Sequence, residues 1–246
     1  MCDTPQKVGP GWRGWMDLPE PDPVTPTGPW IDLSHPLGPD MPRVAFFPEP
    51  RFEQIMEMPG HPLNVTEMQM VVHIGTHVDS PRHFFRDGPA FEDVPIERLH
   101  GPGVVWRIDA GPNETVEPAD LEACKPRLHP GDILLLSAGW SAHAGGATYD
   151  DAHPALSVAA AEWLVARKIK LLAVDFPTPD LPVARRPEGF DWPVHHALLG
   201  RGVIVAEHLR NTASLEGGRA EFMFNALNIA KADGAPVRAL ARPIAG

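Results

Sequence analysis

The sequence predicts a single mixed α/β domain that follows a proline-rich arm. Apolar runs of strand length recur along the chain, whereas apolar residues at helical spacing occur in only two or three segments. The 246 residues contain no internal repeat and no sign of a second core. A strand-rich chain with a few helices and one core is typical of a mixed α/β domain.

The arm is expected to span residues 1–29 and the domain residues 30–246. Neither a helix nor a sheet ladder suits the stretch LPEPDPVTPTGP, because proline lacks the backbone donor and fixes φ. The arm therefore lies over the surface or over a partner subunit, or it is disordered. Three tryptophans, Trp12, Trp15 and Trp30, favour docking, because a loose tail would leave their large apolar area exposed.

Strands are expected where apolar and β-branched runs are bounded by turn residues. In chain order, the expected strands are residues 30–37, 51–58, 63–75, 103–110, 131–139, 169–176 and 203–209. The first two are short, and the third leads into a cluster of histidines. The runs at 131–139 and 169–176 are expected to be buried.

Helices are expected in three segments between these strands. Residues 117–124 place Pro118 in a first turn, and residues 153–168 combine apolar residues at helical spacing with a basic end that suits the helix dipole. Residues 191–202 place Pro193 in a first turn and end at a glycine, as helices often do.

Composition excludes several classes of partner. The net charge is −11 and no basic cluster stands out, which argues against a nucleic-acid partner. Two cysteines give no disulfide framework and suit a reducing compartment. The longest apolar runs are far shorter than a membrane span, and the start of the chain lacks the pattern of a signal peptide. We therefore expect a cytoplasmic protein without a membrane partner.

A metal site is indicated by VVHIGTHVDSPRHFF, which places three histidines and an aspartate within eleven positions. In a straight strand His73 and Asp79 would be roughly 20 Å apart, whereas ligands must come within about 2 Å of one ion. A helix is also a poor fit around Gly75 and Pro81. Gly75 lets the chain bend, so that His73, His77 and Asp79 can converge, and this donor set suits zinc, manganese or iron(II).

Three further residues complete the hypothesis. His83, four residues past Asp79, could lie beside the ion as a proton carrier. His195 lies near a helix start, and Glu207 ends the strand that returns from this helix. Because a carboxylate can bridge two ions, His195 and Glu207 could complete a second site across Asp79. The simpler alternative is that adjacent histidines at a helix start are caps or surface groups.

The pattern HIGTHVDSPRHF resembles the H-x-G-T-H-x-D-x-P-x-H motif of the putative cyclase family, which includes bacterial kynurenine formamidases and isatin hydrolases. The resemblance covers most of the chain from Trp30 onward. Its other segments, in order, are IDLSHPL with MPRVAFFP, GDILLLSAGW, AAEWLVARKIKLLAVDFPTPD, HHALLGRGVIVAEHLRN and ALNIAKADGAPVRALA. The sequence is therefore identified as a member of this family.

The resemblance implies one or two divalent ions per subunit, zinc or manganese. The first ion would be bound by His73, His77 and Asp79. Where the family binds a second ion, its ligands would be Asp79, His195 and Glu207.

Other residues and the fold are implied in the same way. His83 would be the proton donor and acceptor, and Phe47 would contact the substrate ring. The implied fold is a swivelling β/β/α domain that forms a homodimer or higher homo-oligomer.

The sequence departs from the family pattern at three places. His208 stands where the family usually has Asn, and Thr178 stands where Ser is common. The loop ARRPEGFDWP, residues 184–193, together with the arm, makes the chain longer than the compact formamidases. These departures do not change the candidate metal ligands, but they leave the identity of the substrate undetermined.

The expected activity is metal-dependent hydrolysis of an amide C–N bond, in an aryl formamide such as N-formylkynurenine or a cyclic amide such as isatin. A bound metal would activate water, and His83 would carry the proton to the leaving nitrogen. The alternative is a metal-binding module, a pseudo-enzyme that holds a small carboxylate ligand without turnover. A structural zinc site is a poorer match, because such sites favour cysteine ligands.

Overall fold

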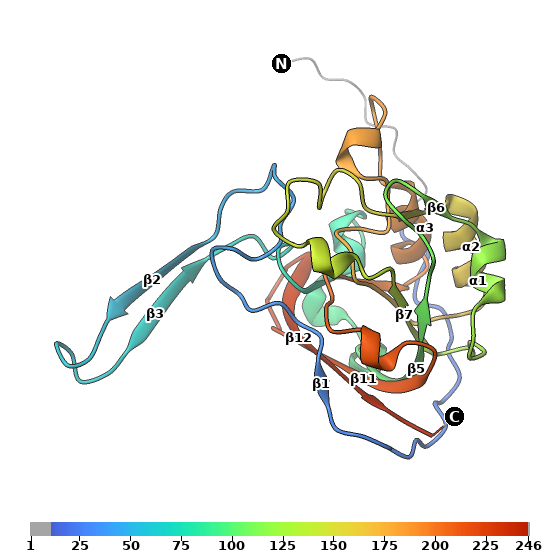
Figure 1. Ribbon diagram of the computed structural model, residues 1–246, viewed down its shortest axis with the longest axis horizontal. Coiled ribbons are helices and arrows are strands. Elements are labelled where there is room, and N and C mark those ends of the chain that lie inside the picture. Colours follow the sequence, from blue (N-terminus) through green and yellow to red (C-terminus); the bar gives the residue numbers. More distant parts are fainter. Residues whose placement is uncertain (1–10, 246) are drawn as a thin grey trace.

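The central sheet of the molecule contains eight strands, and the computed structural model describes residues 11–245. In spatial order the strands are β1 (Ile31–Asp32), β12 (Gly234–Pro243), β11 (Arg219–Ala226), β5 (His100–Arg107), β7 (Ile133–Ser137), β9 (Leu171–Val174), β10 (Ile204–Glu207) and β4 (His77–Asp79). Because β12 also pairs with β4, the sheet closes into a barrel-like ring (Figure 1).

The parallel strands β5, β7, β9 and β10 form one wall of this ring. Parallel neighbours need crossover connections, and α1 (Pro118–Ala123), α2 (Val158–Ala166) and α3 (Pro193–Leu199) precede β7, β9 and β10 in turn. Alternate residues of β7 face opposite sides. Leu134 and Leu136 join the apolar cluster under the helices, whereas Ile133 and Leu135 join the cluster inside the ring.

Smaller elements surround the ring. β2 (Arg51–Met56) and β3 (Val65–Gln69) form a hairpin that projects from the body of the molecule (Figure 1), and β6 (Thr115–Val116) pairs with β8 (Ala155–Leu156). Short 3-10 turns lie at Pro81–His83, Phe91–Asp93, Ile96–Arg98, Trp140–His143, Val183–Arg185 and Ala213–Leu215.

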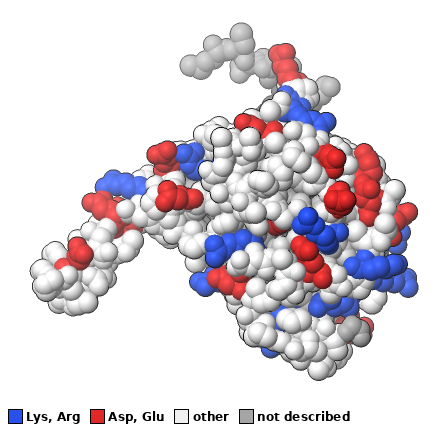
Figure 2. Space-filling view, viewed as in Figure 1, with Lys and Arg blue, Asp and Glu red and all other residues white. Residues whose placement is uncertain are grey.

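The surface carries mixed charge. Acidic and basic side chains are interspersed over the described part of the face shown in Figure 2. None of the helices in residues 11–245 is long and apolar enough to cross a membrane.

The predicted mixed α/β fold is confirmed, although the prediction omits β11 and β12. In β11 alternate side chains such as Phe222 and Phe224 are buried and the others are more exposed, so the segment is not an uninterrupted apolar run. β12 contains Pro236 and Pro243, and proline normally argues against a strand inside a sheet.

Several predicted boundaries are wrong. The strand expected at 30–37 ends at Asp32, and the strand expected at 103–110 begins at His100 and ends at Arg107. The helix expected at 153–168 begins only at Val158, because the Ser157 side chain caps it by accepting a hydrogen bond from the Ala160 amide. The strand expected at 63–75 ends at Gln69, and the chain then turns before β4 begins.

Residues 11–29 of the proline-rich segment lie against the domain. The Arg13 amide donates to the Gly200 carbonyl at 3.1 Å, and Trp12 packs against the cluster under the helices. Pro26 forms an isolated antiparallel bridge with Ile244. Residues 1–10 lie outside the described residues, and the division between arm and domain at residue 29 stays a prediction.

Candidate metal centre

The pairing of β4 with β10 positions three of the predicted ligands. His77 and Asp79 are two residues apart in β4, so their side chains lie on one face of the sheet. Glu207 is the direct cross-strand partner of His77 and therefore shares that face. The Nε2 atom of His77 lies 3.4 Å from Asp79 Oδ1 and 3.4 Å from Glu207 Oε2.

His73 reaches the same carboxylate from the turn before β4. Gly75 has a φ of +64°, a left-handed conformation that few other residues adopt easily, and it makes the bend that the sequence predicts. The bend places His73 Nδ1 2.7 Å from Asp79 Oδ1. At Gly234 of β12 a Cβ atom would lie 2.7 Å from the His73 ring, so the close approach requires glycine there.

His195 arrives from the first turn of α3. The Asp180 carboxylate accepts hydrogen bonds from the Val194 and His195 amides, each at 3.0 Å, and so caps the helix. His195 Nε2 lies 3.4 Å from Asp79 Oδ2 and 3.2 Å from Glu207 Oε1. The helix and returning strand thus bring His195 and Glu207 together across Asp79, as the sequence predicts.

The donor set fits a divalent cation. His77 Nδ1 donates its hydrogen to the Gly75 carbonyl at 2.9 Å, and His195 Nδ1 donates to Asp180 at 2.6 Å. In both imidazoles Nε2 therefore faces the carboxylates. Such a short distance between Nε2 and a carboxylate oxygen is favourable only if a proton or a cation lies between them. Asp79 Oδ2 and Glu207 Oε1 are buried and have no hydrogen-bond partner among residues 11–245. Imidazole and carboxylate ligands of this kind suit zinc and manganese.

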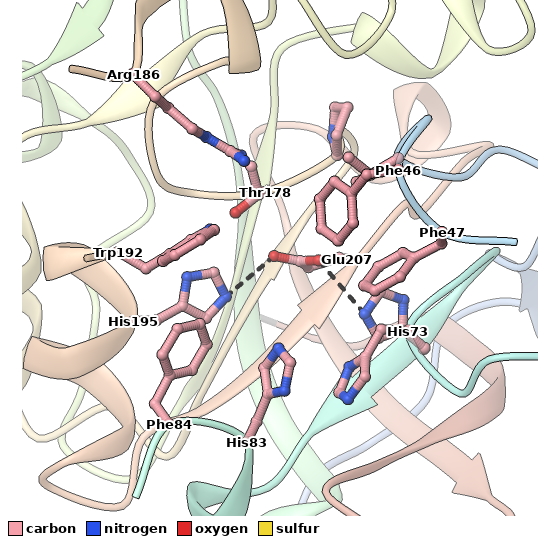
Figure 3. Close-up of a pocket in the computed structure, with 13 residues that line it drawn as sticks. Phe46, Phe47, His73, His83, Phe84, Thr178, Arg186, Trp192, His195 and Glu207 are labelled. Atoms are coloured by element: carbon pink, nitrogen blue, oxygen red, sulfur yellow. Dashed lines mark ion pairs between the residues drawn. The ribbon is translucent and has the colours of Figure 1, made fainter. Parts of the chain in front are cut away.

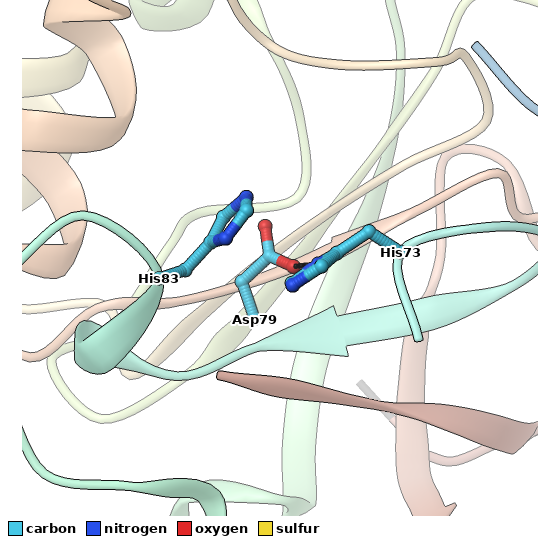
Figure 4. A group of neighbouring side chains, drawn as sticks. All are labelled: His73, Asp79 and His83. Atoms are coloured by element: carbon cyan, nitrogen blue, oxygen red, sulfur yellow. Dashed lines mark hydrogen bonds and ion pairs between the residues drawn. The ribbon is translucent and has the colours of Figure 1, made fainter. Parts of the chain in front are cut away.

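The side chains form three overlapping groups, in each of which the candidate ligand atoms lie within 4.8 Å of one another. The groups are His73, Asp79 and His83 (Figure 4); Asp79, His195 and Glu207; and His77, Glu207 and His208. The second group is the predicted second site. The first group contains His83 in place of the predicted His77, so the division of the ligands between ions stays a prediction.

The electrostatics of the centre favour a cation. Burial alone would raise the pKa of Asp79, but the positive charge of neighbouring imidazoles, His73 above all, lowers it well below its usual range. Burial would also raise the pKa of Glu207, and the imidazoles of His195 and His77 lower it to about 2. Burial would lower the pKa of His77, yet the two carboxylates raise it to about 10. Ionised carboxylates thus hold protons on the imidazoles, and a metal ion would displace these protons.

His83 differs from the buried ligands in its access to solvent. Its side chain is 24% exposed, whereas that of Asp79 is 1% exposed. Its ring stacks on the His73 ring with the centroids 3.7 Å apart, and its Nδ1 lies 3.8 Å from Asp233 Oδ2. Burial lowers the pKa of His83, with Asp79 opposing the shift, so the imidazole is neutral and able to accept a proton near neutral pH.

A pocket with a volume of about 250 Å³ opens over the centre (Figure 3). This is smaller than most ligand pockets, which have roughly 300–1,000 Å³, so a compact ring system suits it. Its aromatic walls are Phe46, Phe47, Phe84 and Trp192. Phe47, the residue expected to contact the substrate ring, lines this pocket, and the prediction omits the other three wall residues.

The two single-residue departures from the family pattern, His208 and Thr178, both lie near the centre. His208 has a φ of +56°, and Asn is one of the residues that tolerate this conformation best, which explains its usual occurrence there. The His208 ring is buried, with Nδ1 2.9 Å from the Tyr149 hydroxyl, and burial lowers its pKa to about 3. Thr178 lines the pocket.

Asp180, Asp233 and Arg186 are site residues that the sequence prediction does not assign. Asp180 lies in the segment DFPTPD, which resembles the family. Its role depends on hydrogen bonds with the backbone of α3, which lies 14 and 15 residues later in the chain. Asp233 Oδ1 lies 3.3 Å from His73 Nε2, and the neighbouring imidazoles of His73 and His83 hold the pKa of Asp233 far below its usual range. No local pattern marks these long-range contacts.

Substitution of Asp180 by Asn is expected to weaken metal binding about 10- to 100-fold. Asp180 Oδ1 accepts from the Val194 amide, whereas Oδ2 accepts from both the amide and Nδ1 of His195. Asn has a single oxygen, so it cannot accept all three hydrogen bonds, and it lacks the negative charge that holds the imidazole. Metal affinity would be measured by competition with a chelator, with Asp109→Asn as an exposed control. An unchanged affinity in Asp180→Asn would show that Asp180 only caps the helix.

A closed mixed α/β sheet with a buried histidine and carboxylate centre defines the class of protein, and the family model described as putative cyclase matches residues 31–181. The chain therefore belongs to the putative cyclase family, as predicted. Kynurenine formamidase of Bacillus mycoides (strain KBAB4) is 31% identical over 223 residues, which cover 89% of this chain and 99% of that relative.

Solved structures share the fold. An isatin hydrolase bound to the product analogue thioisatinate superposes with a TM-score of 0.79 at 21% identity, covering 88% of this chain and 92% of that chain. A potential metal-dependent hydrolase with cyclase activity has a TM-score of 0.71 at 26% identity, covering 87% of this chain and 96% of that chain.

Proposed function

We propose that this protein is a metal-dependent hydrolase that cleaves an amide C–N bond. The substrate class is an aryl formamide such as N-formylkynurenine or a cyclic amide such as isatin. The observation that carries the proposal is the convergence of buried imidazoles and carboxylates at the floor of an aromatic pocket (Figure 3). Relatives named kynurenine formamidase and isatin hydrolase support hydrolysis of this kind.

His73, His77 and Asp79 would bind the first ion, zinc or manganese, and His195 and Glu207 would bind a second together with Asp79. A bound divalent ion supplies a Lewis acid for the carbonyl and lowers the pKa of water. Phe47 and Phe84 hold the ring of the substrate against the floor of the pocket.

His83 moves the proton in the proposed reaction. Its Nδ1 faces Asp233, so Nε2 is the atom assigned to the transfer. Nε2 accepts a proton from the attacking water, whose oxygen bonds to the amide carbon. It then donates that proton to the nitrogen as the C–N bond breaks, which yields a carboxylic acid and an amine.

The β2–β3 hairpin supports the homodimer or higher homo-oligomer that the family resemblance implies. The hairpin projects from the body (Figure 1) and exposes Ile55, Met58 and Met68 by about half of their surface, at 46%, 54% and 50%. Light scattering on the purified protein would measure the oligomeric state.

The decisive experiment is a hydrolysis screen on N-formylkynurenine, isatin and simple imides, with metal content assayed first. We expect turnover of at least one aryl formamide or cyclic amide, and loss of turnover after removal of the metal with a chelator. A protein that binds metal but hydrolyses none of these compounds would instead be a metal-binding module.

A further inference from the structure

Arg186 is the one lysine or arginine that lines the pocket within residues 11–245. It belongs to the 184–193 loop that leads into α3. Its Nε donates to the Leu181 carbonyl at 2.9 Å, and its guanidinium carbon lies 5.5 Å and 5.4 Å from the ring centroids of Phe190 and Trp192. These contacts direct the guanidinium toward the pocket, above Thr178 in Figure 3.

The charge of Arg186 lacks a close partner. Among the described residues, no carboxylate oxygen lies within 4.0 Å of the guanidinium, although Asp180, Glu207 and Asp150 act on it from farther away. The Asp180 carboxylate already accepts hydrogen bonds from α3, and Glu207 belongs to the metal centre. A half-buried guanidinium without an ion pair loses hydration without full compensation, so the pocket favours an anionic group at this end.

We propose that Arg186 is a specificity-determining residue that binds an anionic substituent, such as a carboxylate, on the ring of the substrate. This inference rests on the proposed function and narrows its substrate class to aromatic amides that carry a negative charge apart from the scissile bond. The aromatic walls hold the ring, the metal centre receives the amide, and the guanidinium binds the carboxylate through paired hydrogen bonds.

The test compares 3-formamidobenzoate with formanilide, which differ by one carboxylate. We expect the wild type to show the higher kcat/KM for 3-formamidobenzoate. Arg186→Gln is expected to lower this value about 10- to 100-fold, mainly through KM, because hydrogen bonds to charged groups contribute about 1.5–3 kcal/mol. The value for formanilide is expected to change less than about twofold, since that substrate lacks the partner of Arg186.

Arg185→Gln is the matched control, because it removes the same charge from an exposed neighbour whose guanidinium hydrogen-bonds the Asn113 carbonyl outside the pocket. The control is expected to keep the wild-type preference. Equal losses on both substrates in Arg186→Gln, or the same change of preference in Arg185→Gln, would overturn the inference.

Failure of the proposed function would be visible separately. If the wild type hydrolyses neither compound nor any other amide, both become stable ligands whose binding can be measured by calorimetry. Tighter binding of 3-formamidobenzoate that disappears in Arg186→Gln would then support the anion site. Equal affinities of the wild type and the variant for it would overturn the site.

Discussion

Asp79→Ala is expected to reduce bound metal from one or two ions per subunit to background and to abolish hydrolysis. Asp79 is the side chain that the candidate ligands share: its Oδ1 lies 2.7 Å from His73 and 3.4 Å from His77, and its Oδ2 lies 3.4 Å from His195. Removal of this carboxylate takes a ligand from every ion in the proposed centre.

Thermal unfolding provides a readout that does not depend on activity. Metal at 100 times its Kd stabilises a native protein by about 2.7 kcal/mol, and we expect this gain in the wild type but not in Asp79→Ala. Asp79→Asn preserves the volume of the side chain if the alanine variant fails to fold, and Asp109→Ala is the exposed control. Normal metal content in a folded Asp79 variant would contradict the assignment.

The sequence predicts the parallel wall of the sheet well because its signal is local. β7, β9 and β10 are buried in every residue, and all of their side chains are apolar except Ser137 and Glu207 at the strand ends. Closure of the ring depends on a different kind of information. His77 of β4 pairs with Pro236 of β12, and no local sequence pattern near either residue indicates a partner so far away in the chain.

The candidate site shows the same contrast. His73, His77 and Asp79 lie within seven positions, and Gly75 marks the bend between them, so their convergence can be inferred from spacing and sterics. His195 and Glu207 can be inferred from a helix that leads directly into a strand. Asp180 and Arg186 act through contacts with α3 and with the pocket, and only the folded chain reveals those contacts.

His83→Ala is expected to keep its metal and its fold while the hydrolysis rate falls by about 10²–10⁴, the usual contribution of a general acid or base. His83 lines the pocket, and its side chain is 24% exposed, against 2% for His77 and 4% for His195, so it has the greater access to water and substrate. Kinetics and metal content would be measured on the same preparation. Added imidazole is expected to restore part of the rate, because the space left by the ring opens into the pocket.

The arrangement of His73, Asp79 and His83 makes this experiment discriminating. Their candidate ligand atoms lie within 4.8 Å of one another, so His83 is close enough to serve as a ligand. Loss of metal in His83→Ala would therefore reassign it as a ligand and contradict its role as the proton carrier. Normal turnover would move the proton to another group, and His208 would be the next candidate. His208 is fully buried and lies outside the lining of the pocket, however, which makes transfer to substrate from that position the weaker mechanism.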